Sequence, residues 1–174
     1  ILEVEIEQGL VDGEVLLTPI QEWFLSQGIK EHNHFNQASL FSLREELDRE
    51  TLEGLLKILV EHHDGFRLRY SCDGDGIWKQ SYTLEPRSFL VEVEEFDISG
   101  LSEEAAGIEI EKRNTELHGS LDIETGPILR AGLYRGHKDG RIRLFLVIHH
   151  LVVDGVSWRI LQEDIEKIHK HLRE

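Results

Sequence analysis

The sequence predicts one α/β domain in which helices cover a mixed β-sheet. Two segments, residues 128–134 and 141–148, have the apolar character of buried strands, whereas residues 48–60 and 156–172 carry apolar side chains at helical spacing. Strand-like and helix-like segments interleave along the chain, which is typical of this class. With 174 residues and 40% hydrophobic content, the chain can bury one core but is short for two full-sized domains. We therefore expect a single α+β sandwich over residues 1–174.

The first part of the chain predicts a short helix between two strands. Residues 3–7 alternate apolar and charged side chains, which fits either a strand or a frayed lead-in. Thr18 can cap a helix, Pro19 suits its first position, and Gln21 can complete a capping box. Residues 35–43 are rich in apolar side chains between polar clusters and predict a strand.

A longer helix and a hairpin are expected next. Asp48 can cap a helix whose single apolar stripe contains Leu52, Leu55, Leu56, Leu59 and Val60. Residues 66–71 and 77–82 flank a loop that is rich in aspartate and glycine. They therefore predict two strands joined by a turn.

The second half of the chain predicts three strands and two helices. Residues 90–94 alternate as a strand does, and residues 102–118 form a polar helix with a weak apolar stripe. The strands 128–134 and 141–148 bracket a turn, and the second ends in the unbroken apolar run 144–148. Such a run indicates that this end of the strand is buried on both faces. The helix at 156–172 follows.

Composition excludes several classes of partner. The chain has 19 basic and 34 acidic residues, a net charge of −15, and no basic stripe that could follow a phosphate backbone. We expect no nucleic acid and no membrane among its partners, because its apolar runs are too short to span a bilayer. Cys72, the single cysteine, cannot form an internal disulfide, and no signal segment opens the chain. A reducing, cytoplasmic location is the expectation.

The most informative segment is His149-His150, separated by three residues from Asp154-Gly155. An imidazole at the end of a buried strand can take and return a proton near neutral pH while a rigid element holds it in place. Gly155 permits a tight turn, and Asp154 can cap the next helix or hold a buried cation. From the residues alone, two ordinary hydrogen-bonded histidines and a helix cap explain the segment as well.

The segment matches the pattern His-His-x-x-x-Asp-Gly and so resembles the condensation-domain superfamily of nonribosomal peptide synthetases, which includes chloramphenicol acetyltransferase. The resemblance implies a chloramphenicol acetyltransferase-like lobe with a mixed sheet covered by helices. It implies that His150 is the catalytic residue. His149, Asp154 and Gly155 would support it.

Further segments resemble the epimerization branch of this superfamily. Ser157 and Trp158 follow the pattern as they do in that branch, and residues 17–24 resemble its opening motif. Asn36 and Gln37 match the strand after that motif. Residues 62–70 resemble the second motif, except that Phe66 stands where leucine is commoner. We name Ser157, Trp158, Asn36 and Gln37 as candidate channel or motif residues. Because the likeness covers almost the whole chain, it implies that residues 1–174 are the amino-terminal lobe of a two-lobe epimerization domain, without the carboxy-terminal lobe.

An epimerization domain inverts the α-carbon of an aminoacyl or peptidyl thioester. The resemblance implies that a peptidyl carrier protein presents this substrate on its phosphopantetheine arm, so the lobe itself binds no cofactor. His150 would be one of two acid/base groups, and a glutamate of the carboxy-terminal lobe the other. The lobe alone is expected to have little turnover. The alternatives are a condensation domain or acyltransferase, and a non-catalytic carrier-docking module.

Arg67 lies in the segment that resembles the second family motif. We expect it to form an ion pair with Asp154 that holds the His150 loop in place. Arg69 is interpreted as a solvated surface charge. No metal site is expected, because His32 and His34 lack further ligands and no glutamate completes a calcium loop around Asp73 and Asp75. The aromatic side chains interpreted as core or groove-lining groups are Trp23, Trp78 and Trp158.

Overall fold

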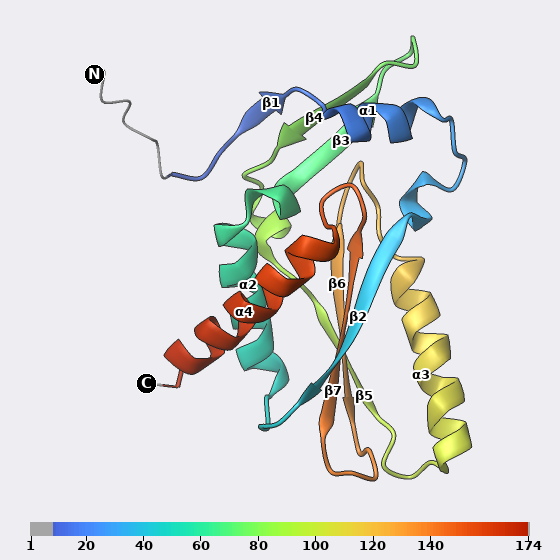
Figure 1. Cartoon of the computed structure of the whole chain (residues 1–174), viewed down its shortest axis with the longest axis vertical. Helices are drawn as coiled ribbons and strands as arrows, with labels where there is room; N and C mark the ends of the chain where they lie inside the picture. The colour runs from blue at the N-terminus through green and yellow to red at the C-terminus, as the bar shows by residue number, and fades with distance from the viewer. Residues whose placement is uncertain (1–8, 174) are drawn as a thin grey trace.

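The computed structural model describes residues 9–173 and arranges them in two β-sheets and four α-helices (Figure 1). A four-stranded sheet, in the order β2-β7-β6-β5, forms the centre, and a three-stranded sheet, β1-β4-β3, lies at one end of it. The predicted class, a mixed sheet covered by helices, is confirmed. The strand considered at residues 3–7 falls outside the described residues.

The elements have the following bounds. The strands are β1 (Gly13–Val15), β2 (Asn36–Leu43), β3 (Leu68–Cys72), β4 (Trp78–Tyr82), β5 (Val93–Asp97), β6 (Leu129–Arg135) and β7 (Ile142–His149). The helices are α1 (Pro19–Ser26), α2 (Arg49–His62), α3 (Glu103–His118) and α4 (Gly155–His171).

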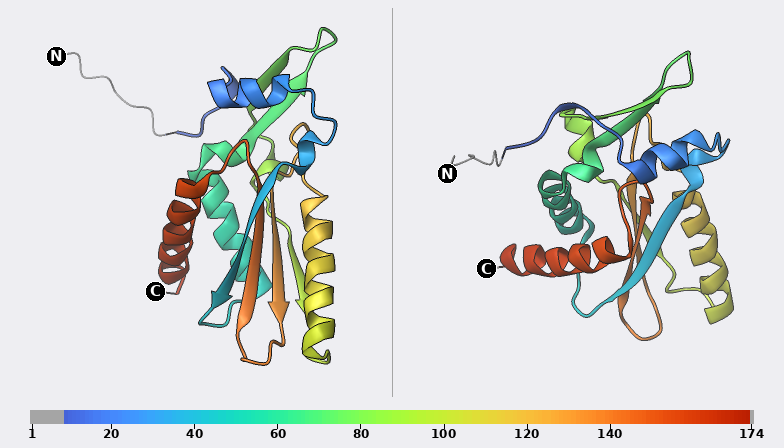
Figure 2. Two further views of the ribbon diagram at one scale, coloured as in Figure 1. Left: turned by 45° about the vertical axis from the view of Figure 1, so that its right-hand side comes forward. Right: turned by 45° about the horizontal axis from the view of Figure 1, so that its top comes forward.

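The central sheet is mixed, because β7 pairs antiparallel with β2 and β6 while β5 pairs parallel with β6. Helices α2 and α4 cover one face of this sheet and α3 covers the other (Figure 2). The two covered faces leave β7 buried along nearly its whole length, as its apolar run predicted. Strand β7, paired on both edges and buried, therefore provides a fixed support from which a functional side chain could project.

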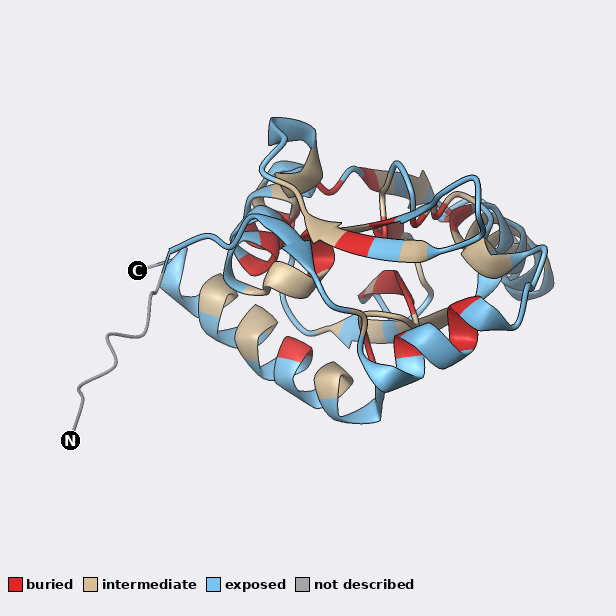
Figure 3. Cartoon of the chain, turned by 90° about the horizontal axis from the view of Figure 1, so that it is seen from above, coloured by how far each residue is buried: buried red, intermediate tan, exposed pale blue. Residues whose placement is uncertain are grey.

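The main core lies between the sheet and helices α2 and α4. The predicted apolar stripe of α2 is confirmed, since each of its five members is at most 1% exposed. Leu161 of α4 is buried in the same cluster, and Trp158 packs against it. Figure 3 shows that buried residues lie on the inner sides of the elements while most of the outer surface is exposed. Trp23, by contrast, is 58% exposed, so its interpretation as a core aromatic is wrong.

The helix caps follow the sequence closely. The backbone N–H of Thr18 donates to Gln21 Oε1 over 2.8 Å, which confirms the predicted capping box of α1. Asp48 Oδ1 accepts from the backbone N–H of Thr51 at 2.8 Å and caps α2. None of the helices in the part of the chain that the structure describes is long and apolar enough to cross a bilayer.

Two boundaries and one strand differ from the prediction. Residues 64–67 form a 3-10 helix, so the first hairpin strand begins at Leu68. Another 3-10 helix, Pro86–Phe89, precedes β5, which begins three residues later than the strand predicted at 90–94. The sequence did not predict β1, because its three residues are exposed and show no apolar alternation.

Candidate active site around His150

Strand β7 and the turn into α4 place His150. The last residue of β7, His149, lies opposite Asn36 of β2. The backbone N–H of His150 then donates to the carbonyl of Phe35 over 2.8 Å, so the chain stays attached to the β2 side for one more residue. Residues 150–154 turn and lead into α4 at Gly155. The His150 ring is thus fixed at the end of the central sheet and remains partly exposed.

His149 is fully buried and has a structural role. Its Nε2 lies 2.8 Å from the carbonyl oxygen of His32, and its Nδ1 accepts from the backbone N–H of Leu151 at 3.2 Å. Burial lowers the pKa of His149 to about 4, against a smaller opposing effect of the bond to His32. The ring is therefore neutral near pH 7, with its proton on Nε2.

His150 is held on three sides. Its Nδ1 lies 2.8 Å from the carbonyl oxygen of Val153, and its Nε2 lies 3.0 Å from the side-chain nitrogen of Gln37. The ring of Phe35 stacks on the imidazole at 4.8 Å between centroids and 19° between planes. A partly exposed imidazole with a fixed orientation can act as an acid or base on a group that reaches it. The stacking by Phe35 was not predicted from the sequence, because nothing in its apolar pattern signals a contact with a later turn.

Two of the four candidate motif residues, Gln37 and Trp158, connect to the His150 ring through hydrogen bonds. The indole N–H of Trp158 donates to Gln37 Oε1 over 2.9 Å, and Gln37 in turn contacts His150. Asn36 instead donates to the carbonyl of His118, at the end of α3. Neighbouring residues of a strand point to opposite faces of the sheet, so Asn36 and Gln37 cannot both reach the same site.

Asp154 and Ser157 form the cap of α4. Asp154 Oδ1 accepts from the backbone N–H groups of Val156, at 3.0 Å, and Ser157, at 2.8 Å, and from the Ser157 hydroxyl at 2.7 Å. The bonds from Ser157 lower the pKa of the Asp154 carboxyl, which is exposed. Asp154 thus caps the helix that carries Trp158.

The expected ion pair between Arg67 and Asp154 is wrong. Arg67 is fully buried and pairs with Asp64, three residues earlier, in the 3-10 helix Asp64–Arg67. It also donates to the carbonyls of Val11, at 2.9 Å, and Thr83, at 3.2 Å. Arg67 therefore ties the lead into β1 to the end of β4, while Asp154 is occupied by its own helix.

Two smaller expectations also change. Arg69 is partly buried rather than a solvated surface charge, and burial lowers its pKa. Gly155 has no positive φ, and a Cβ added there would meet no atom within 4 Å. The fold of this lobe thus does not require glycine at the start of α4, contrary to the tight turn expected there.

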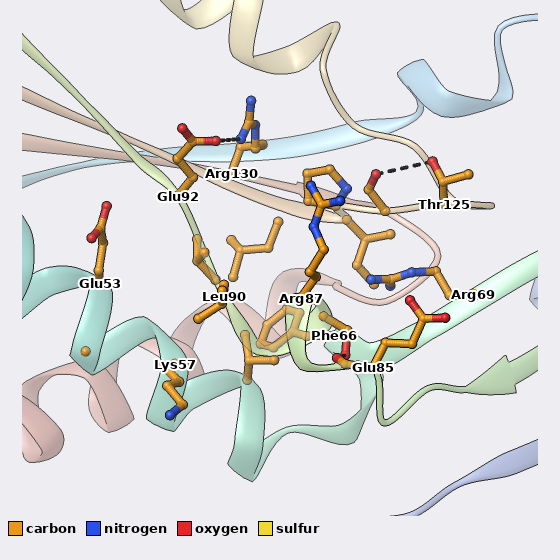
Figure 4. Close-up of a pocket in the computed structure, with 18 of the residues that line it drawn as sticks. Glu53, Lys57, Phe66, Arg69, Glu85, Arg87, Leu90, Glu92, Thr125 and Arg130 are labelled. Carbon is orange, nitrogen blue, oxygen red and sulfur yellow. Dashed lines mark hydrogen bonds and ion pairs between the residues drawn. The ribbon is translucent and has the colours of Figure 1, made fainter.

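A cavity of about 800 Å³ lies elsewhere, between α2, the 3-10 helix Pro86–Phe89 and the start of β6. Figure 4 shows Glu53 and Lys57 of α2 on one side of it, and Arg69 and Glu85 on the other. His150 is not among the residues that line it. The volume of this cavity is therefore no guide to where the imidazole meets a substrate.

The structure brings together one set of metal-ligand types that sequence reasoning did not consider. Side-chain ligand atoms of His62, His63 and Asp164 lie within 4.8 Å of one another. The contact between His63 Nε2 and Asp164 Oδ2, at 3.0 Å, is an ordinary hydrogen bond between α4 and the end of α2.

The loop around Asp73 forms a hairpin turn as predicted. Asp73 Oδ1 accepts from the backbone N–H groups of Asp75 and Ile77.

Sequence comparisons identify relatives of the chain. The family profile described as "Condensation domain" matches residues 11–174. Surfactin synthase subunit 1 of Bacillus subtilis is 40% identical over 172 residues, which cover 98% of this chain and 5% of that protein. Gramicidin S synthase 1 of Brevibacillus brevis is 38% identical over 159 residues, which cover 91% of this chain and 14% of that protein. The chain thus spans a small part of the length of these relatives.

Solved structures share the fold. The epimerization domain from the third module of tyrocidine synthetase B superimposes with a TM-score of 0.85 and 32% identity, covering 96% of this chain and 37% of that one. The first condensation domain of the calcium-dependent antibiotic synthetase gives a TM-score of 0.77 and 21% identity, covering 92% of this chain and 38% of that one. At 21% identity the second likeness concerns the fold alone. Together they confirm the predicted type of fold.

Proposed function

Because the chain belongs to the condensation-domain family of nonribosomal peptide synthetases, we propose that it is the amino-terminal lobe of an epimerization domain. The observation that carries the proposal is His150, a partly exposed imidazole held at the end of β7 by Val153, Gln37 and Phe35. The 32% identity to an epimerization domain favours this branch.

The proposed substrate is an aminoacyl or peptidyl thioester on the phosphopantetheine arm of a peptidyl carrier protein. His150 Nε2 takes the proton from the α-carbon on one face, and the electron pair of the C–H bond moves into the thioester carbonyl to give an enolate. A second acid/base group returns a proton to the opposite face and the carbonyl reforms. The net change is inversion of configuration, with no atom gained or lost.

The second acid/base group is assigned to a carboxy-terminal lobe, as the family resemblance implies. This chain covers 37% of the solved epimerization domain and 38% of the solved condensation domain, which leaves room for such a lobe. The partners proposed are therefore that lobe and the loaded carrier protein. No cofactor bound by the amino-terminal lobe is needed, because the carrier supplies the arm.

A condensation domain is the competing function, and the family match favours it equally. In that case His150 would assist an amine that attacks the thioester, and an amide would form without exchange of the α-proton. A carrier-docking module without catalysis is the other alternative, in which His150 would have no chemical role.

One assay separates the three. The complete two-lobe protein, given a loaded carrier in deuterium oxide, should incorporate deuterium at the α-carbon without forming an amide. His150→Ala should abolish incorporation, while His62→Ala, a change of an exposed histidine at the end of α2, should not. Amide formation without exchange would establish condensation instead. If His150→Ala left deuterium incorporation and amide formation unchanged, only the docking role would remain.

A further inference from the structure

A chain of hydrogen bonds runs from Trp158 through Gln37 and His150 to Val153. An indole N–H can only donate, so Gln37 Oε1 must be the atom that accepts from Trp158 at 2.9 Å. This contact fixes the orientation of the Gln37 amide. Its nitrogen, which can only donate, therefore faces His150 Nε2 at 3.0 Å.

Both ends of this chain specify the same form of His150. Since Gln37 donates, His150 Nε2 must accept and carries a lone pair. The carbonyl of Val153, 2.8 Å from Nδ1, can only accept, so Nδ1 carries the proton. The neutral ring with its proton on Nδ1 satisfies every polar atom in the chain. The other neutral form would set two donors against each other at Gln37 and two acceptors against each other at Val153.

We infer that Trp158 and Gln37 are positioning residues that hold His150 in the form whose lone pair is on Nε2. The inference rests on the proposed function, because it assigns Nε2 of His150 the proton transfer. A second proton, on Nε2, would face the amide nitrogen of Gln37, and two donors would then oppose each other.

The same geometry describes how the substrate gains access to the lone pair. The α-hydrogen has to approach Nε2 along the direction that the Gln37 nitrogen occupies at rest, so this nitrogen has to move aside. The bond from Trp158 to Gln37 Oε1 can persist while it does. Phe35, stacked on the imidazole, keeps the ring plane fixed during the exchange of partners.

Gln37→Glu tests the inference, because it keeps the size of the side chain and replaces its donor with an acceptor. A carboxylate at position 37 favours a proton on Nε2 while Val153 retains the one on Nδ1. In the complete protein with a loaded carrier, kcat for α-proton exchange should fall about 100-fold. KM should change by less than about threefold, since the substrate contacts are unaltered.

Trp158→Phe provides a second, milder variant. It removes the N–H that orients the amide and leaves an aromatic ring in the same place, so Gln37 can turn either way. We expect kcat to fall about fivefold, the typical effect of one hydrogen bond. The matched controls are Gln27→Glu, at the exposed end of α1, and Trp78→Phe, in β4, and both should retain the wild-type kcat.

Nitrogen-15 spectra of the histidine-labelled complete protein report the proton positions directly. The His150 signals are identified by their loss in His150→Gln. The wild type should show a protonated Nδ1 and an unprotonated Nε2, whereas Gln37→Glu should show both nitrogens protonated at the same pH. Trp158→Phe should show a mixture of the two neutral forms, which a purely structural role of the indole would not produce.

The outcomes distinguish this inference from the proposed function. A wild-type kcat and an unchanged His150 spectrum in Gln37→Glu and Trp158→Phe would overturn the positioning role, even with His150→Ala inactive. Full exchange activity in His150→Ala would instead overturn the proposed function. If Gln37→Glu does not fold, the spectrum of Trp158→Phe decides alone.

Discussion

His149 and His150 are the same residue type at adjacent positions, yet the fold uses them in opposite ways. His149 is fully buried, and its ring carries its proton on Nε2, donated to His32. His150 is partly exposed, and its ring carries its proton on Nδ1, donated to Val153. The partner of each ring nitrogen, together with access to solvent, therefore decides which histidine is structural and which is available for chemistry.

Replacing the partly exposed ring of His150 should have the largest effect, and this effect should fall mainly on activity. His150→Asn removes the acid/base group, so exchange of the α-proton should slow by a factor of about 10² to 10⁴. Because the ring is partly exposed, the free energy of unfolding should fall by no more than about 1 kcal/mol. The α-deuterium assay and urea denaturation measure the two effects. A loss of stability as large as that of the next variant would make His150 structural.

Replacing the buried ring should reverse this pattern. His149→Ala leaves a cavity and removes the partners of the His32 carbonyl and the Leu151 N–H. We expect the free energy of unfolding to fall by about 4 kcal/mol, as measured by urea denaturation of the chain. A variant as stable as the wild type would show that the ring is dispensable to the fold.

The two histidines should also differ in how pH acts through them. The folded-state pKa of His149, about 4, lies below its ordinary value of 6.5, so between these values the unfolded chain binds a proton that the folded chain does not. Its contribution to stability is complete above pH 6.5 and is lost as the pH falls toward 4. The loss amounts to about 2 to 3 kcal/mol.

The measurement compares wild type and His149→Gln by urea denaturation at pH 7 and pH 4.5. The variant should lose less stability on acidification than the wild type. Burial also lowers the pKa of His118 and of His137, but both are present in the two proteins and their effects cancel. An equal loss in both proteins would show that His149 is not the group that titrates.

The sequence was a good guide wherever a few neighbouring residues decide the structure. The stripe of α2 and the caps at Thr18 and Asp48 were predicted because spacing and hydrogen-bonding capacity are local properties. The candidate acid/base residue, His150, was identified from a motif at the end of an apolar run, through the family that this motif resembles. In each case, successive residues of the pattern lie no more than four positions apart in the sequence.

Contacts between distant segments were less accessible. Gln37 and His150 are 113 residues apart, so their contact depends on the pairing of β2 with β7. Motif resemblance suggested that both residues matter, but not that they touch or which atom donates. The ion pair of Arg67 with Asp154 failed for a related reason. A nearer carboxylate, Asp64, meets the guanidinium, and no residue spacing reveals which acid a buried arginine selects.

The smallest expected effect concerns Asp154, whose position beside His150 suggests a role that its contacts do not support. Asp154→Asn keeps an oxygen that can accept from Val156 and Ser157, so the cap of α4 persists, and activity should stay within about twofold of the wild type. Asp154→Ala loses the acceptor and should lower Tm, by less than His149→Ala does.

The pKa of Asp154 in the folded chain is lower than its ordinary value of 3.8, so the charged carboxylate stabilises the fold above pH 3.8. This contribution is lost as the pH falls below 3.8, and the Asp154→Asn variant should therefore differ from wild type mainly in acid. If Asp154→Asn were as damaging as Asp154→Ala at neutral pH, the negative charge rather than the cap would matter.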